Sequence, residues 1–185
     1  MARRALEMSR DDPDVLWAAS YTLASLAREH AGAAHGIDRA LLLNPNSAHA
    51  WMAKGLVSCF LEKYEAGIEH LERAMRLSPL DPLSYIFAVG LSVAYSRLDR
   101  YEEALEWAER SLRDHPDYVA ARRLRVVLLV YLERMNEARE ALRHLLELVP
   151  GLTITNLPQI VAGGIQSRGG AKYLEAFRKA GLPEE

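Results

Sequence analysis

A period of 34 residues constrains this chain more than any other feature. Proline follows a helix-like stretch four times, at intervals of 34, 37 and 34 residues: Pro45, Pro79, Pro116 and Pro150. Trp17 and Trp51 are also 34 residues apart. Self-similarity at such a period is the signature of a repeat architecture, in which each repeat is one supersecondary unit. The chain is therefore expected to be an array of similar units.

Each unit carries the pattern of two helices. In residues 48–81, apolar side chains recur with helical spacing first over 51–60 and then over 68–77. Gly55, Gly67 and Ala74 are small residues placed where two helices would approach closely. Pro79 ends the second helix, because proline has no amide donor and disfavours a helical residue before it. The unit is predicted to be a helical hairpin.

This pattern resembles the tetratricopeptide repeat, a 34-residue helix-turn-helix with an early Trp, a mid-helix Gly or Ala, a Tyr before the second helix and a Pro near the end. The match is clearest in "YEAGIEHLERAMRLSP" and "YEEALEWAERSL". The resemblance implies an all-α, right-handed superhelical solenoid with helical caps. We frame the chain as a capping helix or the tail of a preceding repeat (1–13), four repeats (14–47, 48–81, 85–118, 119–152) and a C-terminal capping segment (153–185).

The C-terminal segment departs from the period. Its Gly and Pro residues predict a short helix near 155–162 and a loop at 163–170. The stretch "AKYLEAFRKAG" then predicts a helix with Tyr173, Leu174 and Phe177 on one face and Gly181 as its stop. Such a helix would cover the last repeat, since repeat arrays need a terminal element with one polar face.

A narrower resemblance is carried by "LNPNSAHAW", "AMRLSPLDP", "PGLTITNLP" and "FRKAGLPEE". These are similar to the C-terminal repeat module of bacterial, especially rhizobial, proteins in which a class III nucleotide cyclase or a winged-helix regulator precedes the repeats. The resemblance implies a regulatory setting and supplies no ligand. The start of the chain reads like the last turns of a second helix, so we expect a piece of a longer bacterial protein.

Composition argues against several classes of function. The formal net charge is −2, from 23 basic and 25 acidic residues, which predicts neither a nucleic-acid nor a membrane partner. No apolar run approaches the roughly 20 residues that span a bilayer. The single Cys59 excludes an internal disulfide and a thiolate zinc site, and fits a reducing, cytoplasmic location.

Catalytic patterns are missing from the sequence as well. Its six His have no metal-ligand spacing, and there is no nucleophile elbow. The stretch "GGIQSRGG" lacks the residue order of a phosphate-binding loop. We therefore expect that the protein is not an enzyme and that it binds neither a metal ion nor a cofactor.

The resemblance places a partner-binding groove on the first helices of the repeats. The residues implied are Met52, Leu56, Phe60, Val89, Val93, Arg97, Arg123, Val127 and Tyr131. This mainly apolar set favours an apolar peptide or an amphipathic helix as ligand. The carboxylate clamp of chaperone-binding members is not supported, because its positions hold Thr22, Leu56, Val93 and Val127. Alternatively, the groove is closed, and these residues pack on each other or on the C-terminal segment.

We expect a protein–protein interaction scaffold or regulatory module. One alternative is the non-catalytic C-terminal part of a nucleotide cyclase or transcription regulator. Another is a self-association module, with homo-oligomers forming through the apolar N-terminal edge at residues 2–8. For the Arg-rich fourth repeat, either the charges form a solvated face or Arg123 faces the groove and meets a partner carboxylate.

Overall fold

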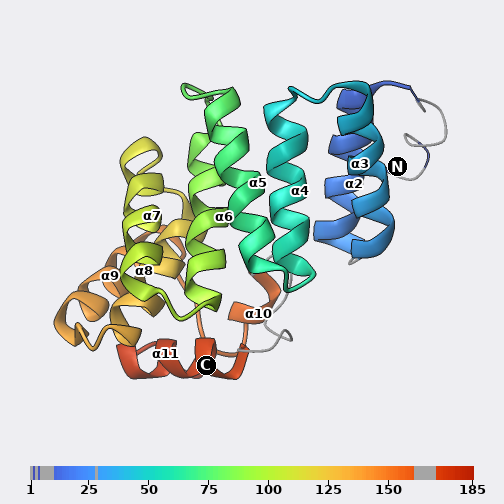
Figure 1. Ribbon diagram of the computed structural model, residues 1–185. Helices are drawn as coiled ribbons and strands as arrows, with labels where there is room; N and C mark the ends of the chain where they lie inside the picture. Colours follow the sequence, from blue (N-terminus) through green and yellow to red (C-terminus); the bar gives the residue numbers. More distant parts are fainter. Residues whose placement is uncertain (1, 3, 5–10, 28, 161–169) are drawn as a thin grey trace. The chain divides into compact units, whose positions relative to one another are not determined.

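The computed structural model describes residues 2, 4, 11–27, 29–160 and 170–185, and these residues form helices and turns with no strand (Figure 1). The all-α prediction is confirmed. The chain divides into two compact units, residues 1–94 and 95–185, which we describe separately. The predicted N-terminal edge at 2–8 and the loop at 163–170 lie almost wholly outside the described residues.

The first unit contains two complete helical hairpins and most of a fifth helix. Helix α2 (Pro13–Ala27) packs on α3 (His30–Leu43), and α4 (Ala48–Phe60) packs on α5 (Tyr64–Leu77) (Figure 1). Helix α6 (Ser84–Arg97) begins in this unit and ends in the second. Helix α5 is strongly amphipathic: it buries Gly67, Leu71 and Ala74 and exposes most of its charged residues.

Glycine lets α4 and α5 approach each other closely. A Cβ atom at Gly55 would lie 2.6 Å from Leu71 Cγ and 3.0 Å from the carbonyl oxygen of Gly67. A Cβ atom at Gly67 would lie 2.7 Å from Cys59 Sγ and 3.2 Å from the Gly55 carbonyl oxygen. The backbones of the two helices therefore occupy the space that side chains take elsewhere. The small residues seen in the sequence are explained by this contact.

A methyl group added at Gly55 should destabilise the protein. Gly55→Ala gains helix propensity but overpacks the contact with Leu71, so we expect a net loss of about 1–3 kcal/mol in the free energy of unfolding. Gly32 in α3 is the matched control, since a Cβ there meets nothing within 4 Å. Gly32→Ala should stabilise by up to about 1 kcal/mol. Urea unfolding of both variants measures the difference. Equal effects would contradict the close packing of α4 on α5.

Three turns between paired helices share one geometry that contains no glycine. Glu62, Asp99 and Glu133 have positive φ angles of 59°, 57° and 60°. In each turn the next amide donates to a carbonyl five residues earlier, as in Lys63 N to Ser58 O at 2.9 Å. The same bond joins residues 100 to 95 and 134 to 129, at 3.0 and 2.9 Å. The repeated bond offsets the cost of about 1–2 kcal/mol for a left-handed non-glycine residue.

The link between repeats also has a common bond. Trp51 Nε1 donates to the carbonyl oxygen of Pro45 at 2.8 Å. In the fourth repeat, where the sequence has Arg122 in place of the aromatic residue, Arg122 Nε donates to the carbonyl oxygen of Pro116, also at 2.8 Å. The two residue types share an N–H donor on a long side chain. Arg therefore preserves the contact to the proline turn despite its different character.

The link from α5 to α6 contains a buried carboxylate. The Asp81 side chain is 5% exposed and accepts a hydrogen bond from the Leu83 amide at 2.9 Å. Its Oδ2 lies 3.4 Å from Nε2 of His49, whose ring stacks on Trp17. Burial alone would raise the pKa of Asp81, but the bonds from Leu83 and Ser78 and the nearby His49 lower it below its usual value.

The Asp81 carboxylate should make stability depend on pH. Its pKa is lower in the folded than in the unfolded chain, where it is about 3.9. Its contribution is therefore present above that value and is lost as pH falls through the folded-state pKa. We expect Asp81→Asn to cost about 1–2 kcal/mol at neutral pH and progressively less as pH falls through the folded-state pKa. Denaturant unfolding curves measured from neutral to acidic pH test this dependence. The control is Asp117→Asn, since Asp117 is exposed. A cost that does not change with pH would refute the assignment.

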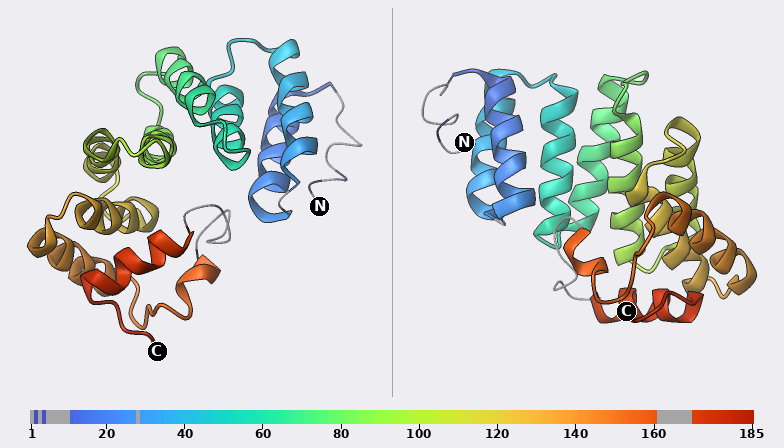
Figure 2. Two further views of the ribbon diagram at one scale, coloured as in Figure 1. Left: turned by 60° about the horizontal axis from the view of Figure 1, so that its bottom comes forward. Right: turned by 180° about the vertical axis from the view of Figure 1, so that it is seen from behind.

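The second unit packs its capping helix on the fourth hairpin. It contains α7 (Tyr101–Asp114), α8 (Val119–Tyr131), α9 (Met135–Leu148), α10 (Leu157–Ile160) and α11 (Gly170–Ala180). Helix α7 packs on α8, α8 on α9, and α11 on α8 and α9 (Figure 2). Helix α11 ends at Gly181, with φ of 103°, as the sequence predicted. After it, Pro183 O accepts from Ile154 N at 2.9 Å.

Candidate functional site

The predicted groove residues of the first unit divide into two groups. Met52 and Leu56 on α4 are 2% and 8% exposed and belong to the core. Leu56 Cδ2 lies 2.7 Å from the Cβ position of Gly90, so Leu56 packs against the backbone of α6. These two side chains offer little surface to a partner in this structure, because the adjacent first helices close over them.

The second group keeps apolar surface accessible. Phe60 on α4 and Val89 and Val93 on α6 are half-buried. Leu26, which is 34 residues before Phe60 and has the equivalent place on α2, is 81% exposed. The Phe60 ring lies 5.3 Å from the ring of His30, between centroids. Apolar side chains at equivalent places on successive first helices are the surface on which an extended or helical apolar ligand would bind.

In the second unit, the predicted residues lie beside the chain's own C-terminal helix. Val127 and Arg123 on α8 are 2% and 7% exposed, whereas Arg97 and Tyr131 are half-buried. Helix α11 packs on α8, and the hydroxyl of Tyr173 on α11 is hydrogen-bonded to Arg123. Burial raises the pKa of Tyr173, and the charges of Arg123 and Arg97 act against that rise.

A cluster of four side chains joins α11 to α7, to the turn before it and to α8. Lys172 Nζ lies 3.4 Å from Asp99 Oδ1 and also bonds the hydroxyl of Tyr101. The same ammonium lies 4.9 and 4.7 Å from the ring centroids of Tyr101 and Tyr131. The bond with Tyr101 and the charge of Asp99 raise the pKa of Lys172. Burial raises the pKa of Tyr131. These contacts hold the start of α11 against α7, the turn before α7, and α8.

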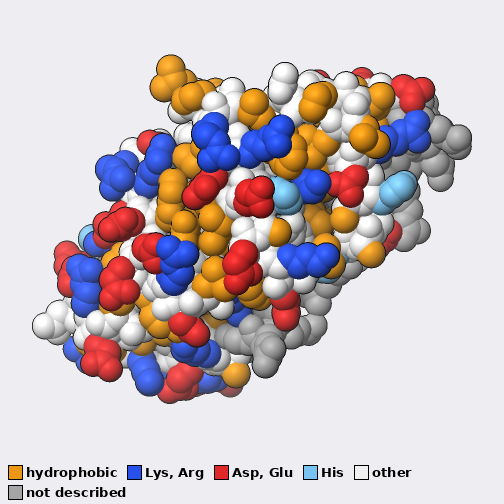
Figure 3. Space-filling model, in the orientation of Figure 1, with side chains coloured by type: hydrophobic (Ala, Val, Ile, Leu, Met, Phe, Trp, Pro, Cys, Tyr) orange, Lys and Arg blue, Asp and Glu red, His pale blue; other side chains and the backbone are white. Residues whose placement is uncertain are grey.

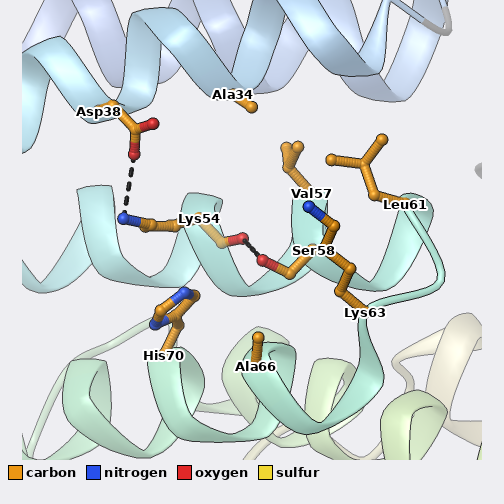
Figure 4. Close-up of a pocket in the computed structure, with 9 residues that line it drawn as sticks. All are labelled: Ala34, Asp38, Lys54, Val57, Ser58, Leu61, Lys63, Ala66 and His70. Carbon is orange, nitrogen blue, oxygen red and sulfur yellow. Dashed lines mark hydrogen bonds and ion pairs between the residues drawn. The ribbon is translucent and has the colours of Figure 1, made fainter.

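A pocket between α3, α4 and α5 is lined in part by polar groups that pair with one another (Figure 4). Lys54 Nζ lies 3.0 Å from Asp38 Oδ1, and the Ser58 hydroxyl donates to the Lys54 carbonyl at 2.8 Å (Figure 4). Burial and then Lys54 lower the pKa of His70. The Ser58 hydroxyl is directed at a backbone carbonyl and not at the imidazole, so the pair does not form a nucleophile with its base.

Other chemistry finds little support in the described part of the chain. Burial raises the pKa of the Cys59 thiol to about 12, which makes it unreactive at neutral pH. The described residues contain no group of three or more His, Cys, Asp or Glu that could hold a metal ion. None of the helices in the described ranges is long and apolar enough to cross a membrane. Figure 3 shows acidic and basic side chains interspersed over one face of the molecule.

Comparison with protein families and solved structures identifies the fold. Residues 48–79 match the model of the tetratricopeptide repeat family. A solved structure of PilW, a widely conserved type IV pilus biogenesis factor, is similar with a TM-score of 0.75 and 18% identity, covering 97% of this chain and 78% of that one. YrrB, a TPR protein with an unusual peptide-binding site, is similar with a TM-score of 0.62 and 21% identity, covering 97% and 90%.

A third solved structure contains a bound peptide. The first TPR of Spaghetti (RPAP3), bound to the HSP90 peptide SRMEEVD, is similar with a TM-score of 0.53 and 23% identity, covering 57% of this chain and 82% of that one. A comparison with curated proteins gave no match. The fold is therefore that of tetratricopeptide-repeat proteins, as the sequence predicted. The narrower resemblance to cyclase-associated or winged-helix proteins receives no support.

Sequence reasoning missed what the predicted residues contact. It assigned both Leu56 and Phe60 to the predicted groove and left open whether that groove is closed; in the structure Leu56 packs against α6, whereas Phe60 is half-buried. It left open whether Arg123 faces solvent or a partner, and the structure pairs it with Tyr173. The signal for the first point was Gly90, whose missing side chain makes room for Leu56. Whether the predicted residues bind a partner stays a prediction.

Charged replacements should separate core from accessible positions. Leu56→Glu buries a carboxylate against α6 and should cost about 3–5 kcal/mol of stability. Val93→Glu, at a half-buried site, should cost about 1–2 kcal/mol. Leu80, which is 95% exposed in the link between α5 and α6, is the control, and Leu80→Glu should change stability little. Denaturant unfolding ranks the three. Wild-type stability for Leu56→Glu would show that α4 and α6 do not pack as described.

Proposed function

We propose that this protein is a protein–protein interaction scaffold or regulatory module that binds an apolar peptide or amphipathic helix on the inner face of its first unit. The observation that carries the proposal is the accessible apolar surface of Phe60, Val89 and Val93, together with the exposed Leu26. The similar fold of a TPR protein with a peptide-binding site, and of a TPR bound to a peptide, supports this class of function.

The chemistry of these residues defines the ligand. Burying one such apolar side chain against a partner contributes about 1.5–3 kcal/mol when burial is complete. Two or three of them would contribute about 3–9 kcal/mol in total, so micromolar affinity also requires further contacts that offset the cost of association. The apolar residues of the ligand, placed at helical spacing, would face this surface, and the polar residues of the ligand would remain in water.

Peptide selection can test this proposal without a known partner. A display library of random 16-residue peptides is selected on the full chain, and the affinities of enriched synthetic peptides are measured by fluorescence polarisation. We expect apolar residues at spacings of three, four and seven. Val93→Asp and Phe60→Asp should each weaken binding at least tenfold, equivalent to about 1.4 kcal/mol. The control variant Leu80→Asp should bind normally. Peptides that bind equally well to all three variants would refute the proposed surface.

Self-association is a second candidate, favoured by large apolar side chains that remain exposed on the first hairpin. Leu26, Leu42 and Leu43 are 81%, 84% and 46% exposed. Exposed apolar surface of this kind favours association between copies. Light scattering over a range of concentrations distinguishes it from binding of a separate partner. The regulatory setting beside a cyclase or winged-helix domain rests on the sequence resemblance alone.

A further inference from the structure

One cation in the second unit is buried without an anion. Arg123 on α8 is 7% exposed, and its Nε and Nη1 atoms are buried with no hydrogen-bond partner. The guanidinium contacts the neutral hydroxyl of Tyr173 on α11. A guanidinium stays protonated in proteins, so this charge is desolvated and only partly compensated.

The described residues offer no carboxylate for this position. Among the described residues, no ion pair includes Arg123, and Asp99 pairs with Lys172. Residues 161–169, "VAGGIQSRG", contain neither Asp nor Glu. Arg97 adds a second positive charge, which acts on Tyr131 and Tyr173. The surroundings of Arg123 are therefore positive and partly apolar, and they suit a single buried negative charge.

The surface around Arg123 also has the shape for a helix. Helix α11 packs on α8 (Figure 2). Its Ala176, Phe177 and Ala180 are buried, at 1%, 0% and 3% exposure. Tyr173 lies one turn before Phe177 on the same helix, with ring centroids 5.3 Å apart. An amphipathic helix is thus accommodated on α8, with an uncharged residue at the position that meets Arg123.

We propose that Arg123 anchors a carboxylate-bearing helix of a partner protein, which docks on α8 in the place that α11 takes in the free chain. The partner carries Asp or Glu where α11 carries Tyr173, and apolar residues where α11 carries Phe177. This inference extends the proposed peptide-binding function to the second unit and rests on it. We assign a carboxylate because Asp or Glu can accept charge-assisted hydrogen bonds from the two unpartnered nitrogen atoms of Arg123.

Competition with α11 makes the contact regulatory. A tethered helix has an effective concentration in the millimolar range, so a partner must bind considerably better than α11 itself. The charge-assisted bond to Arg123 supplies that advantage, because α11 lacks it. The partner must also displace the contacts at the ends of α11, which are Lys172 with Asp99 and Pro183 O with Ile154 N.

The first experiment places the carboxylate in the chain's own helix. Tyr173→Glu and Tyr173→Gln are compared in the full chain, each with Arg123 or with Arg123→Met. We expect the Glu variant to melt at a higher temperature than the Gln variant at pH 7. That difference should decrease as pH falls below about 4.3, the pKa of an unfolded-state Glu, and should be absent in the Arg123→Met background. Equal melting temperatures at pH 7, or a difference that survives Arg123→Met, would overturn the proposal.

The second experiment supplies the helix from outside. The probe is a fluorescein-labelled peptide of residues 170–185 carrying Tyr173→Glu, with the Tyr173→Gln peptide as its match. The target is the full chain with Phe177→Ala, which weakens the internal α11. The Glu peptide should bind at least tenfold more tightly, and Arg123→Met should remove the difference. Equal affinity, or no binding of either peptide, would overturn the proposal. If Phe177→Ala does not fold, the first experiment decides.

The two proposals fail separately. Val93→Asp and Phe60→Asp lie in the first unit and should leave the difference between the Glu and Gln peptides unchanged. Loss of Arg123-dependent binding with normal binding of the selected peptides would overturn the anchor alone. Loss of binding to both surfaces would overturn the peptide-binding function itself.

Discussion

The close approach of paired helices is the constraint on which the rest of this structure depends. In the second hairpin, the backbones of α4 and α5 meet at Gly55 and Gly67, where a Cβ atom would fall within 3.2 Å of the opposite backbone. Because the two helices meet there, Leu71 can pack across the contact toward Gly90 on the next first helix. A small residue inside a hairpin therefore controls how that hairpin packs on its neighbour.

The same packing limits which predicted groove residues are accessible. Gly90 allows α6 to lie against Leu56, and this burial removes Leu56 from the surface that a ligand could reach. Phe60 lies one turn further along α4, beyond this contact, and remains half-buried. The first unit thus keeps accessible apolar surface at Phe60 on α4 and at Val89 and Val93 on α6.

In the second unit, a helix of the same chain covers the predicted groove residues of α8. Its last helix, α11, packs on α8 and positions the phenol of Tyr173 at Arg123. A phenol can accept a hydrogen bond but carries no charge at neutral pH, so it compensates a buried guanidinium only in part. Helix α11 therefore covers α8 and α9 but leaves Nε and Nη1 of Arg123 without a hydrogen-bond partner. This combination is what a replaceable internal ligand would need.

The sequence by itself determined the repeat, the helical hairpins, the stop of α11 at Gly181 and the all-α fold. Those properties follow from local patterns: a 34-residue period, helical spacing of apolar residues, and prolines and glycines at helix ends. It could not reveal that Arg122 would bond Pro116 as Trp51 bonds Pro45, because the two residues share only an N–H donor. Only the tertiary structure decided that Leu56 is buried, that Asp81 meets His49, and that Arg123 lies under Tyr173. The physical reason is that burial and partner choice depend on elements distant in sequence, and helical periodicity shows only which face of a helix a residue occupies.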